Sequence, residues 1–111
     1  MPGIAGKLTS FTPKEVTELF KRSRTLTRNQ VFNLLAAPQS KEFGRILLVA
    51  PRRVGTSPER NLLKRRIRSI FYEEKLFERG YDCIIIFKKD AATVPFEQLK
   101  KMILEAFARL P

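Results

Sequence analysis

Histidine and tryptophan are absent from this sequence, and cysteine occurs once, at Cys83. Without histidine, the chain lacks the general base that enzymes use most often near neutral pH. Its eleven carboxylates are scattered, and none form the closely spaced pair that would hold metal ions for phosphodiester hydrolysis. The single cysteine cannot form an internal disulfide, and its apolar neighbours predict a small buried side chain. The chain is therefore poorly equipped to catalyse a reaction by itself.

Long apolar stretches are also missing. Runs such as Cys83 to Phe87 are far shorter than the roughly 18 residues that a membrane-spanning helix needs. The first dozen residues carry one lysine and no sustained apolar segment, which does not fit a secretory signal. These features predict a cytoplasmic protein with no membrane partner.

Positive charge is what the sequence has in excess. Twenty-two Lys and Arg residues face eleven Asp and Glu residues, which gives a net charge of +11. Such an excess repels itself unless a polyanion neutralises it, so nucleic acid is the first partner to expect. The length of 111 residues and the 43% hydrophobic content predict one domain over residues 1–111, with residues 1–7 as a loose tail.

The apolar spacing predicts an α+β domain in the order helix, strands, helix, strand, helix, with the helices packed on a mixed sheet. Ser57 is the expected N-cap of the second helix, because Pro58 and Glu59 suit its first turn. The expected helices are 13–22, 57–75 and 94–110, and the expected strands lie within 26–37, 45–50 and 81–87.

The densest charge lies between Arg52 and Arg68, where seven basic side chains accompany one acid, Glu59. At about 100° per residue, the helix from residue 57 has an apolar flank and a separate basic arc. No acidic residue stands four positions from the basic ones, so the arc repels itself and suits a row of phosphates, although a solvated surface is the alternative. Gly55 before this helix fits either an ordinary turn or a phosphate-facing loop. The apolar flank comprises Leu63, Ile67 and Ile70, and the basic arc comprises Arg60, Asn61, Lys64, Arg65 and Arg68.

The order of these residues resembles the signature of the bacterial ribonuclease P protein component. The matching residues are Arg52-Arg53-Val54-Gly55, Arg60-Asn61, Lys64-Arg65 and Arg68. The likeness extends through Asp82–Ile86 to the closing helix near Phe96, and backward through Glu15 to Phe20. Leu62 departs from it, because the family pattern has arginine there. Pro51 likewise replaces a serine, and Val16 an aromatic residue.

The resemblance implies a two-layer sandwich of about four strands and three helices, with a left-handed crossover between two parallel strands. General rules would predict the right-handed connection. It further implies that this chain is the protein subunit of a ribonucleoprotein endonuclease, in which RNA-bound Mg²⁺ supports the cleavage and the protein binds no cofactor. The RNA partners would be the catalytic RNA and the 5′ leader of precursor tRNA, which is removed to form the mature 5′ end, and no protein partner is required.

The resemblance assigns two surfaces. The central helix and the preceding loop would contact the catalytic RNA through Arg52, Arg53, Arg60, Asn61, Lys64, Arg65 and Arg68. A cleft between the sheet and the first helix would receive the leader through Phe20, Arg28, Asn29 and Phe32. Either phenylalanine could instead be a core residue, and an exposed turn explains Arg28 and Asn29 equally well. A structural RNA-binding protein of ribosomal type is the alternative function.

Overall fold

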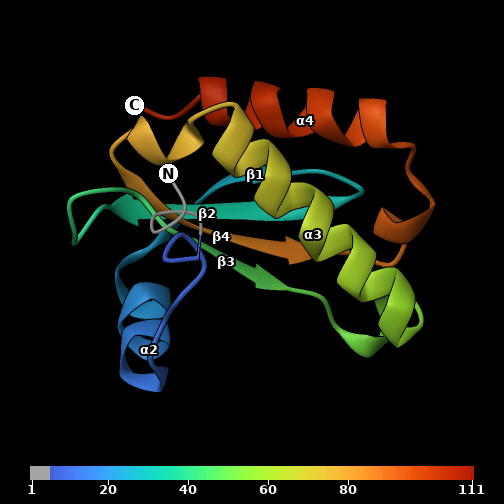
Figure 1. Ribbon diagram of the computed structural model, residues 1–111, viewed down its shortest axis with the longest axis horizontal. Coiled ribbons are helices and arrows are strands. Elements are labelled where there is room, and N and C mark those ends of the chain that lie inside the picture. Colours follow the sequence, from blue (N-terminus) through green and yellow to red (C-terminus); the bar gives the residue numbers. More distant parts are fainter. Residues whose placement is uncertain (1–5) are drawn as a thin grey trace.

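The computed structural model describes residues 6–111, and its elements follow the predicted order (Figure 1). Short 3₁₀ turns precede α3, β4 and α4. Gly6 and Lys7, the part of the predicted tail within the described residues, are exposed, and residues 1–5 lie outside them. The helices are α2 (Pro13–Arg22), α3 (Ser57–Glu73) and α4 (Phe96–Ala108), and the strands are β1 (Arg24–Arg28), β2 (Phe32–Pro38), β3 (Ile46–Val49) and β4 (Tyr81–Phe87).

Two helices begin with reciprocal side-chain caps. Thr12 and Glu15 form the capping box of α2, in which each side chain accepts a hydrogen bond from the other residue's backbone N–H. The same arrangement starts α3, where Thr56 Oγ1 accepts from Glu59 N–H at 3.3 Å and Glu59 Oε1 accepts from Thr56 N–H at 2.8 Å. The prediction that Ser57 caps α3 is therefore wrong by one residue, because Thr56 lies at the correct spacing from Glu59.

The four strands form one mixed sheet in the order β1-β2-β4-β3. β1 and β4 each pair antiparallel with β2, whereas β3 pairs parallel with β4. A crossover through α3 joins the two parallel strands, as the resemblance implies, and its left hand stays a prediction. The predicted α+β fold, with a four-stranded mixed sheet and three helices, is confirmed.

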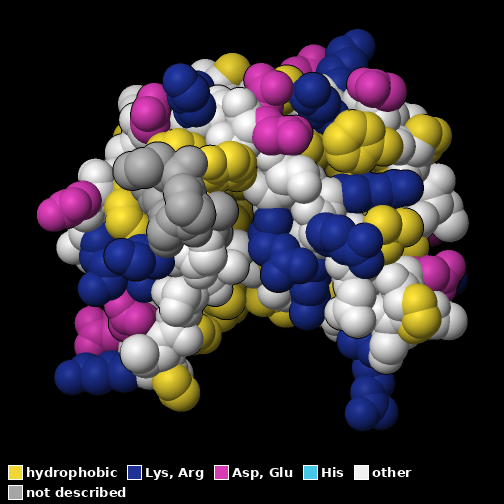
Figure 2. Space-filling model, in the orientation of Figure 1, with side chains coloured by type: hydrophobic (Ala, Val, Ile, Leu, Met, Phe, Trp, Pro, Cys, Tyr) yellow, Lys and Arg dark blue, Asp and Glu magenta, His cyan; other side chains and the backbone are white. Residues whose placement is uncertain are grey.

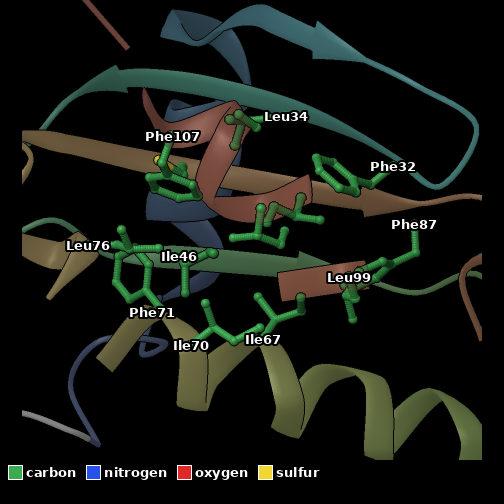
Figure 3. Close-up of a cluster of buried hydrophobic side chains, with 14 of the residues drawn as sticks. Phe32, Leu34, Ile46, Ile67, Ile70, Phe71, Leu76, Phe87, Leu99 and Phe107 are labelled. Carbon is green, nitrogen blue, oxygen red and sulfur yellow. The ribbon is translucent and has the colours of Figure 1, made fainter. Parts of the chain in front are cut away.

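The main core lies between the sheet and the helices α3 and α4 (Figure 3). Alternate residues of β2 and β4 point into it, as a period of two requires. Cys83 is fully buried in this core, as its apolar neighbours predict. The large side chains enclosed here include Phe32, Leu34, Ile67, Ile70, Phe71, Phe87, Leu99 and Phe107.

The opposite face of the sheet is covered only in part. In Figure 1, α2 crosses this face below the sheet, away from α4. Leu19 is the one buried residue of α2, and it packs in a small cluster with Ala37 and Ile84. The helix therefore leaves part of the sheet accessible to a partner.

Candidate nucleic-acid interface

The surface of α3 divides into two flanks, as the helical spacing predicts. Leu63, Ile67 and Ile70 are buried in the core. On the other flank Asn61, Arg65 and Arg68 are exposed and Lys64 is half-buried. No hydrogen bond or ion pair within residues 6–111 engages the side chains of these four polar residues, which we call the basic face of α3. Their donors are free to bind phosphate oxygens or base edges.

Arg60 behaves differently from its neighbours on α3. Its Nε donates to the Gly55 carbonyl at 3.2 Å, Nη1 to the Ala50 carbonyl at 3.4 Å and Nη2 to Ser57 Oγ at 3.0 Å. The half-buried guanidinium therefore holds the loop between β3 and α3. Of the two interpretations of Gly55, these contacts fit an ordinary turn, since its N–H also donates to the Arg52 carbonyl.

The basic charge continues along one edge of the sheet. Because β3 and β4 are parallel, the segments that follow them leave the sheet at the same edge. Arg52 and Arg53 follow β3 and are exposed in a 3₁₀ turn, while Lys88 and Lys89 follow β4. Arg28 ends β1 at this edge and is exposed. We call these five residues the basic edge.

Lys88 and Lys89 did not emerge as candidates from the sequence. The sequence gives little indication of their role, since two lysines after a buried strand are also typical of an ordinary solvated turn. Only the parallel pairing of β3 with β4 brings them to the edge that carries Arg52 and Arg53. Lys88 Nζ also donates to the Asn29 carbonyl at 2.6 Å, which ties the end of β4 to the β1–β2 turn.

The sheet face beside the basic edge is apolar and half-exposed. Directly paired residues point to the same side of a sheet, so the register places Asn33, Ile86 and Val49 in one row with Arg28 at its end. A second row, closer to α2, contains Leu35, Ile84 and Leu47. Ile84 is buried, Arg28 is exposed, and the other five are half-buried. We call Asn33, Leu35, Leu47, Val49 and Ile86 the open sheet face.

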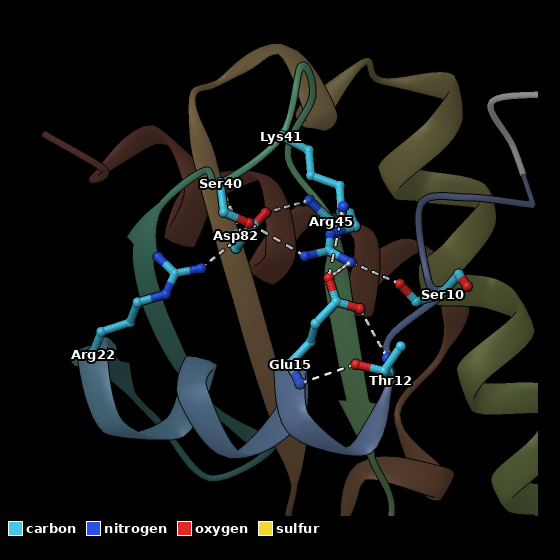
Figure 4. A network of polar contacts seen from close by, with 8 residues as sticks. All are labelled: Ser10, Thr12, Glu15, Arg22, Ser40, Lys41, Arg45 and Asp82. Carbon is cyan, nitrogen blue, oxygen red and sulfur yellow. Dashed lines mark hydrogen bonds and ion pairs between the residues drawn. The ribbon is translucent and has the colours of Figure 1, made fainter.

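The open sheet face lines a groove beside α2. Figure 2 shows the molecule hollowed between its α2 side and the beginning of α3, with hydrophobic and basic side chains around the hollow. Phe20 of α2 is 42% exposed. At about 100° per residue, Phe20 lies on the flank of α2 away from Glu15 and Arg22. Figure 4 shows those two side chains pointing toward Arg45 and Asp82 at the far end of the sheet. From the helical spacing, the Phe20 flank therefore faces the groove.

The leader-site prediction for Phe32 is wrong. Its side chain is 0% exposed and lies in the core beneath α3 and α4, on the face opposite the groove. An aromatic ring in that position cannot stack on a base. The sequence permits either face because a strand alternates its side chains, and only the pairing with β4 decides which face each one takes.

Asn29 and Arg28 differ in how much of each side chain is free. Asn29 Oδ1 accepts from the N–H groups of Val31 and Phe32, both at 2.8 Å, so this oxygen shapes the turn between β1 and β2. Arg28 is exposed and lies at the end of the outer row of the open sheet face. Of the two, Arg28 has the charged group available to a backbone phosphate.

The three departures from the family pattern occupy different environments. Leu62 is 40% exposed on α3 and interrupts the charge of that helix. Arg66, one turn later, does not fill this place, because its guanidinium lies 5.8 Å from the centre of the Phe96 ring. Val16 is half-buried on the groove flank of α2, and Pro51 caps the 3₁₀ turn that carries Arg52.

Burial shifts the pKa of Cys83. Desolvation, assisted by the nearby charge of Asp82, raises the pKa of the Cys83 thiol to about 12.

Among residues 6–111, no group of three or more His, Cys, Asp or Glu side chains is placed to hold a metal ion. In the same part of the chain, no helix is long and apolar enough to span a bilayer.

Comparison with known proteins gives one consistent result. The family model described as Ribonuclease P matches residues 11–111. A protein named "Ribonuclease P protein component" from Bacillus velezensis is 32% identical over 86% of this chain and 83% of its own length. One of the same name from Bacillus pumilus is 31% identical over 86% of this chain and 82% of its own.

Solved structures share the fold. The RNase P protein from Thermotoga maritima superposes with a TM-score of 0.80 at 23% identity, covering 93% of this chain and 97% of its own. The Staphylococcus aureus RNase P protein gives a TM-score of 0.77 at 17% identity, covering 91% of this chain and 93% of its own. The matched sequence, the fold and the basic face of α3 agree, and the chain belongs to the family of ribonuclease P protein components.

Proposed function

We propose that this chain binds the catalytic RNA of ribonuclease P through the basic face of α3 and Arg52 and Arg53, and the 5′ leader of precursor tRNA in the groove beside α2. The observation that carries the proposal is the meeting of two unlike surfaces at one edge of the sheet. One presents basic side chains that have no acidic partner, and the other is a half-exposed apolar sheet face. A folded RNA and an unpaired strand need these two kinds of surface, respectively.

The leader is single-stranded, so its bases are free to contact apolar side chains. Phe20 offers an aromatic plane, and Val49 and Ile86 form the neighbouring floor of the groove. Arg28 and Lys88, at the end of this floor, supply positive charge for the leader's phosphates. The protein thus holds and orients a substrate strand that pairs with nothing else.

The bond cleavage itself belongs to the RNA in this proposal. Without histidine or a metal-binding cluster among residues 6–111, the protein's surfaces bind and orient rather than transfer protons. We assign the Mg²⁺ ions to the RNA partner and no chemical step to this chain. The complex would act in the cytoplasm and needs no further protein.

The test combines purified chain with a ribonuclease P RNA at a Mg²⁺ concentration too low for the RNA alone. We expect the chain to restore removal of the leader, and the chain without RNA to leave precursor tRNA intact. A matched control carries Lys64→Ala, Arg65→Ala and Arg68→Ala together, which should abolish restoration because the RNA contact is lost. Failure of the unaltered chain to restore cleavage, or cleavage by rigorously RNA-free chain, would contradict the proposal.

A further inference from the structure

The wall of the groove formed by α2 has little apolar support. Leu19 is its only buried residue, yet the helix crosses the sheet in a defined position. Both ends of α2 are instead tied to the sheet by charged side chains (Figure 4). Glu15 anchors the beginning of the helix and Arg22 anchors its end.

Asp82 is the centre of the anchor at the end of α2. Its carboxylate is 0% exposed and receives Arg22 Nη2 at 2.9 Å. It also accepts from the Arg45 N–H at 3.0 Å, and from both the N–H and the hydroxyl of Ser40 at 3.3 Å. Arg22 Nη1 completes the anchor by donating to the Pro38 carbonyl at 2.6 Å. The two Arg22 bonds join the end of α2 to β2 and β4, and the other bonds of Asp82 join β4 to the segment between β2 and β3.

Arg45 is the centre of the other anchor. Its almost fully buried guanidinium pairs with Glu15 Oε2 at 3.1 Å and donates to the Ser10 carbonyl at 2.9 Å. It lies 4.3 Å from the centre of the Phe11 ring. Arg45 Nη2 donates to Ser40 Oγ at 3.3 Å, so the Ser40 hydroxyl links the two anchors. The network therefore connects both ends of α2 through one sheet end.

We propose that Asp82 and Arg45 are positioning residues for leader binding. Their network fixes the distance of α2 from the sheet, and this distance sets the width of the groove in which Phe20 and the open sheet face hold the unpaired strand. Hydrogen-bonded charges hold a geometry more narrowly than a single apolar contact does, because their energy depends on direction as well as distance. This inference rests on the proposed function of the groove.

A substitution of Asp82 can distinguish an indirect effect on the position of α2 from the loss of a direct contact with RNA. Its side chain has no accessible surface, and its negative charge would repel a phosphate. Any effect of Asp82 on leader binding must therefore pass through Arg22 and α2. Arg22 alone would be ambiguous, because its side chain is 37% exposed and carries the charge that phosphates attract.

The first experiment compares Arg22→Met with Lys21→Met in the holoenzyme assembled with ribonuclease P RNA. Both variants remove one positive charge from α2, but Lys21 is exposed and makes no hydrogen bond or ion pair within the described residues. The measurement is the affinity for precursor tRNA divided by that for mature tRNA. We expect Arg22→Met to lower this ratio by roughly tenfold, because the charge-assisted hydrogen bonds that anchor α2 are lost. Lys21→Met should change it little, and equal losses would overturn the inference.

The second experiment adds Asp82→Asn and the double variant. If Arg22 acts by anchoring α2, each single variant and the double variant should lower the ratio by a similar factor. Amide hydrogen exchange should become faster in residues 13–22 and stay unchanged in α3. Asp82→Asn leaving the ratio intact would show that Arg22 touches the RNA itself, and would overturn the inference.

A milder variant covers the case in which Asp82→Asn fails to fold. Ser40→Ala removes only the hydroxyl that links Asp82 with Arg45, and Ser40 is exposed. It should lower the ratio by a smaller factor in a folded protein, and an unchanged ratio would count against the network. Two other results would contradict the proposed leader groove itself and not only the positioning role of the network. One is an unaltered holoenzyme with no preference for precursor over mature tRNA, and the other is an Ile86→Ser variant that keeps this preference.

Discussion

The two faces of the sheet show how one alternating strand pattern serves two purposes. The face beneath α3 and α4 packs into the main core, with Phe32, Ile85 and Phe87 fully buried. The face beneath α2 holds Leu35, Val49 and others only half-buried, and its covering helix is fixed by charged hydrogen bonds. The first face stabilises the fold, and the second leaves apolar surface free for a ligand.

Phe32 and Phe20, one on each side of the sheet, should contribute very differently to stability. Phe32→Ala should lower the free energy of unfolding by about 3–5 kcal/mol, because it leaves a cavity in the packed face. Phe20→Ala should lower it by about 1 kcal/mol or less, because 42% of that residue is already exposed and no packed cavity would be left. Urea denaturation followed by circular dichroism measures both. Equal losses would remove the distinction between the two faces.

Phe20 should also matter for binding of the leader in the groove beside the open sheet face. Phe20→Leu keeps most of the side-chain volume while removing the aromatic plane, so the fold and the affinity for the catalytic RNA should be preserved. Preference for precursor over mature tRNA should fall by up to about 1–3 kcal/mol, the range for one stacked base. A folded variant with unchanged preference would show that the leader is bound by other groups, with Arg28 and Asn29 next to be tested.

Two arginines of α3 should respond differently to substitution, although both lie near the expected RNA contact. Arg65→Ala removes an unpartnered charge, so the log–log salt slope of RNA binding should fall by about one without loss of stability. Arg60→Ala should weaken RNA binding too, and also lower stability by about 1–2 kcal/mol, because its three hydrogen bonds hold the loop after β3. Filter binding across salt concentrations, with urea denaturation, separates the two outcomes. Identical behaviour of both variants would contradict the loop-holding role of Arg60.

The Cys83 thiol, in the packed face, should be unreactive in the folded protein. With a pKa of about 12 and no exposed surface, the Cys83 thiol should resist an aromatic disulfide reagent at pH 8. It should react promptly in urea, which is the control. Burial raises this pKa, so the folded protein keeps the thiol protonated at pH values where the unfolded chain loses the proton. The contribution of Cys83 to the free energy of unfolding is therefore fully present below pH 9.0, and it should decline as the pH rises from there toward about 12. Rapid labelling of the native protein would show that the packed face opens.

Local chemistry made much of the fold predictable. The order of helices and strands, the limits of β4 and the two flanks of α3 depend on periodicities of two or 3.6 residues within single segments. The three-residue spacing of Thr12 and Glu15 likewise indicates where α2 begins. The predicted N-cap of α3 is wrong by one residue because Thr56 and Ser57 are adjacent and both are suitable capping residues.

Tertiary structure decided where these segments meet. Composition and short-range spacing are properties of the chain alone, so they suffice to predict a basic, histidine-free α+β domain with a basic helix. Only the tertiary structure placed Phe32 inside, brought Lys88 to the edge of the sheet that carries Arg52, and buried Asp82 against Arg22 sixty residues away. Such contacts depend on sheet order and register, and a shift of one residue would exchange every inward side chain for its outward neighbour.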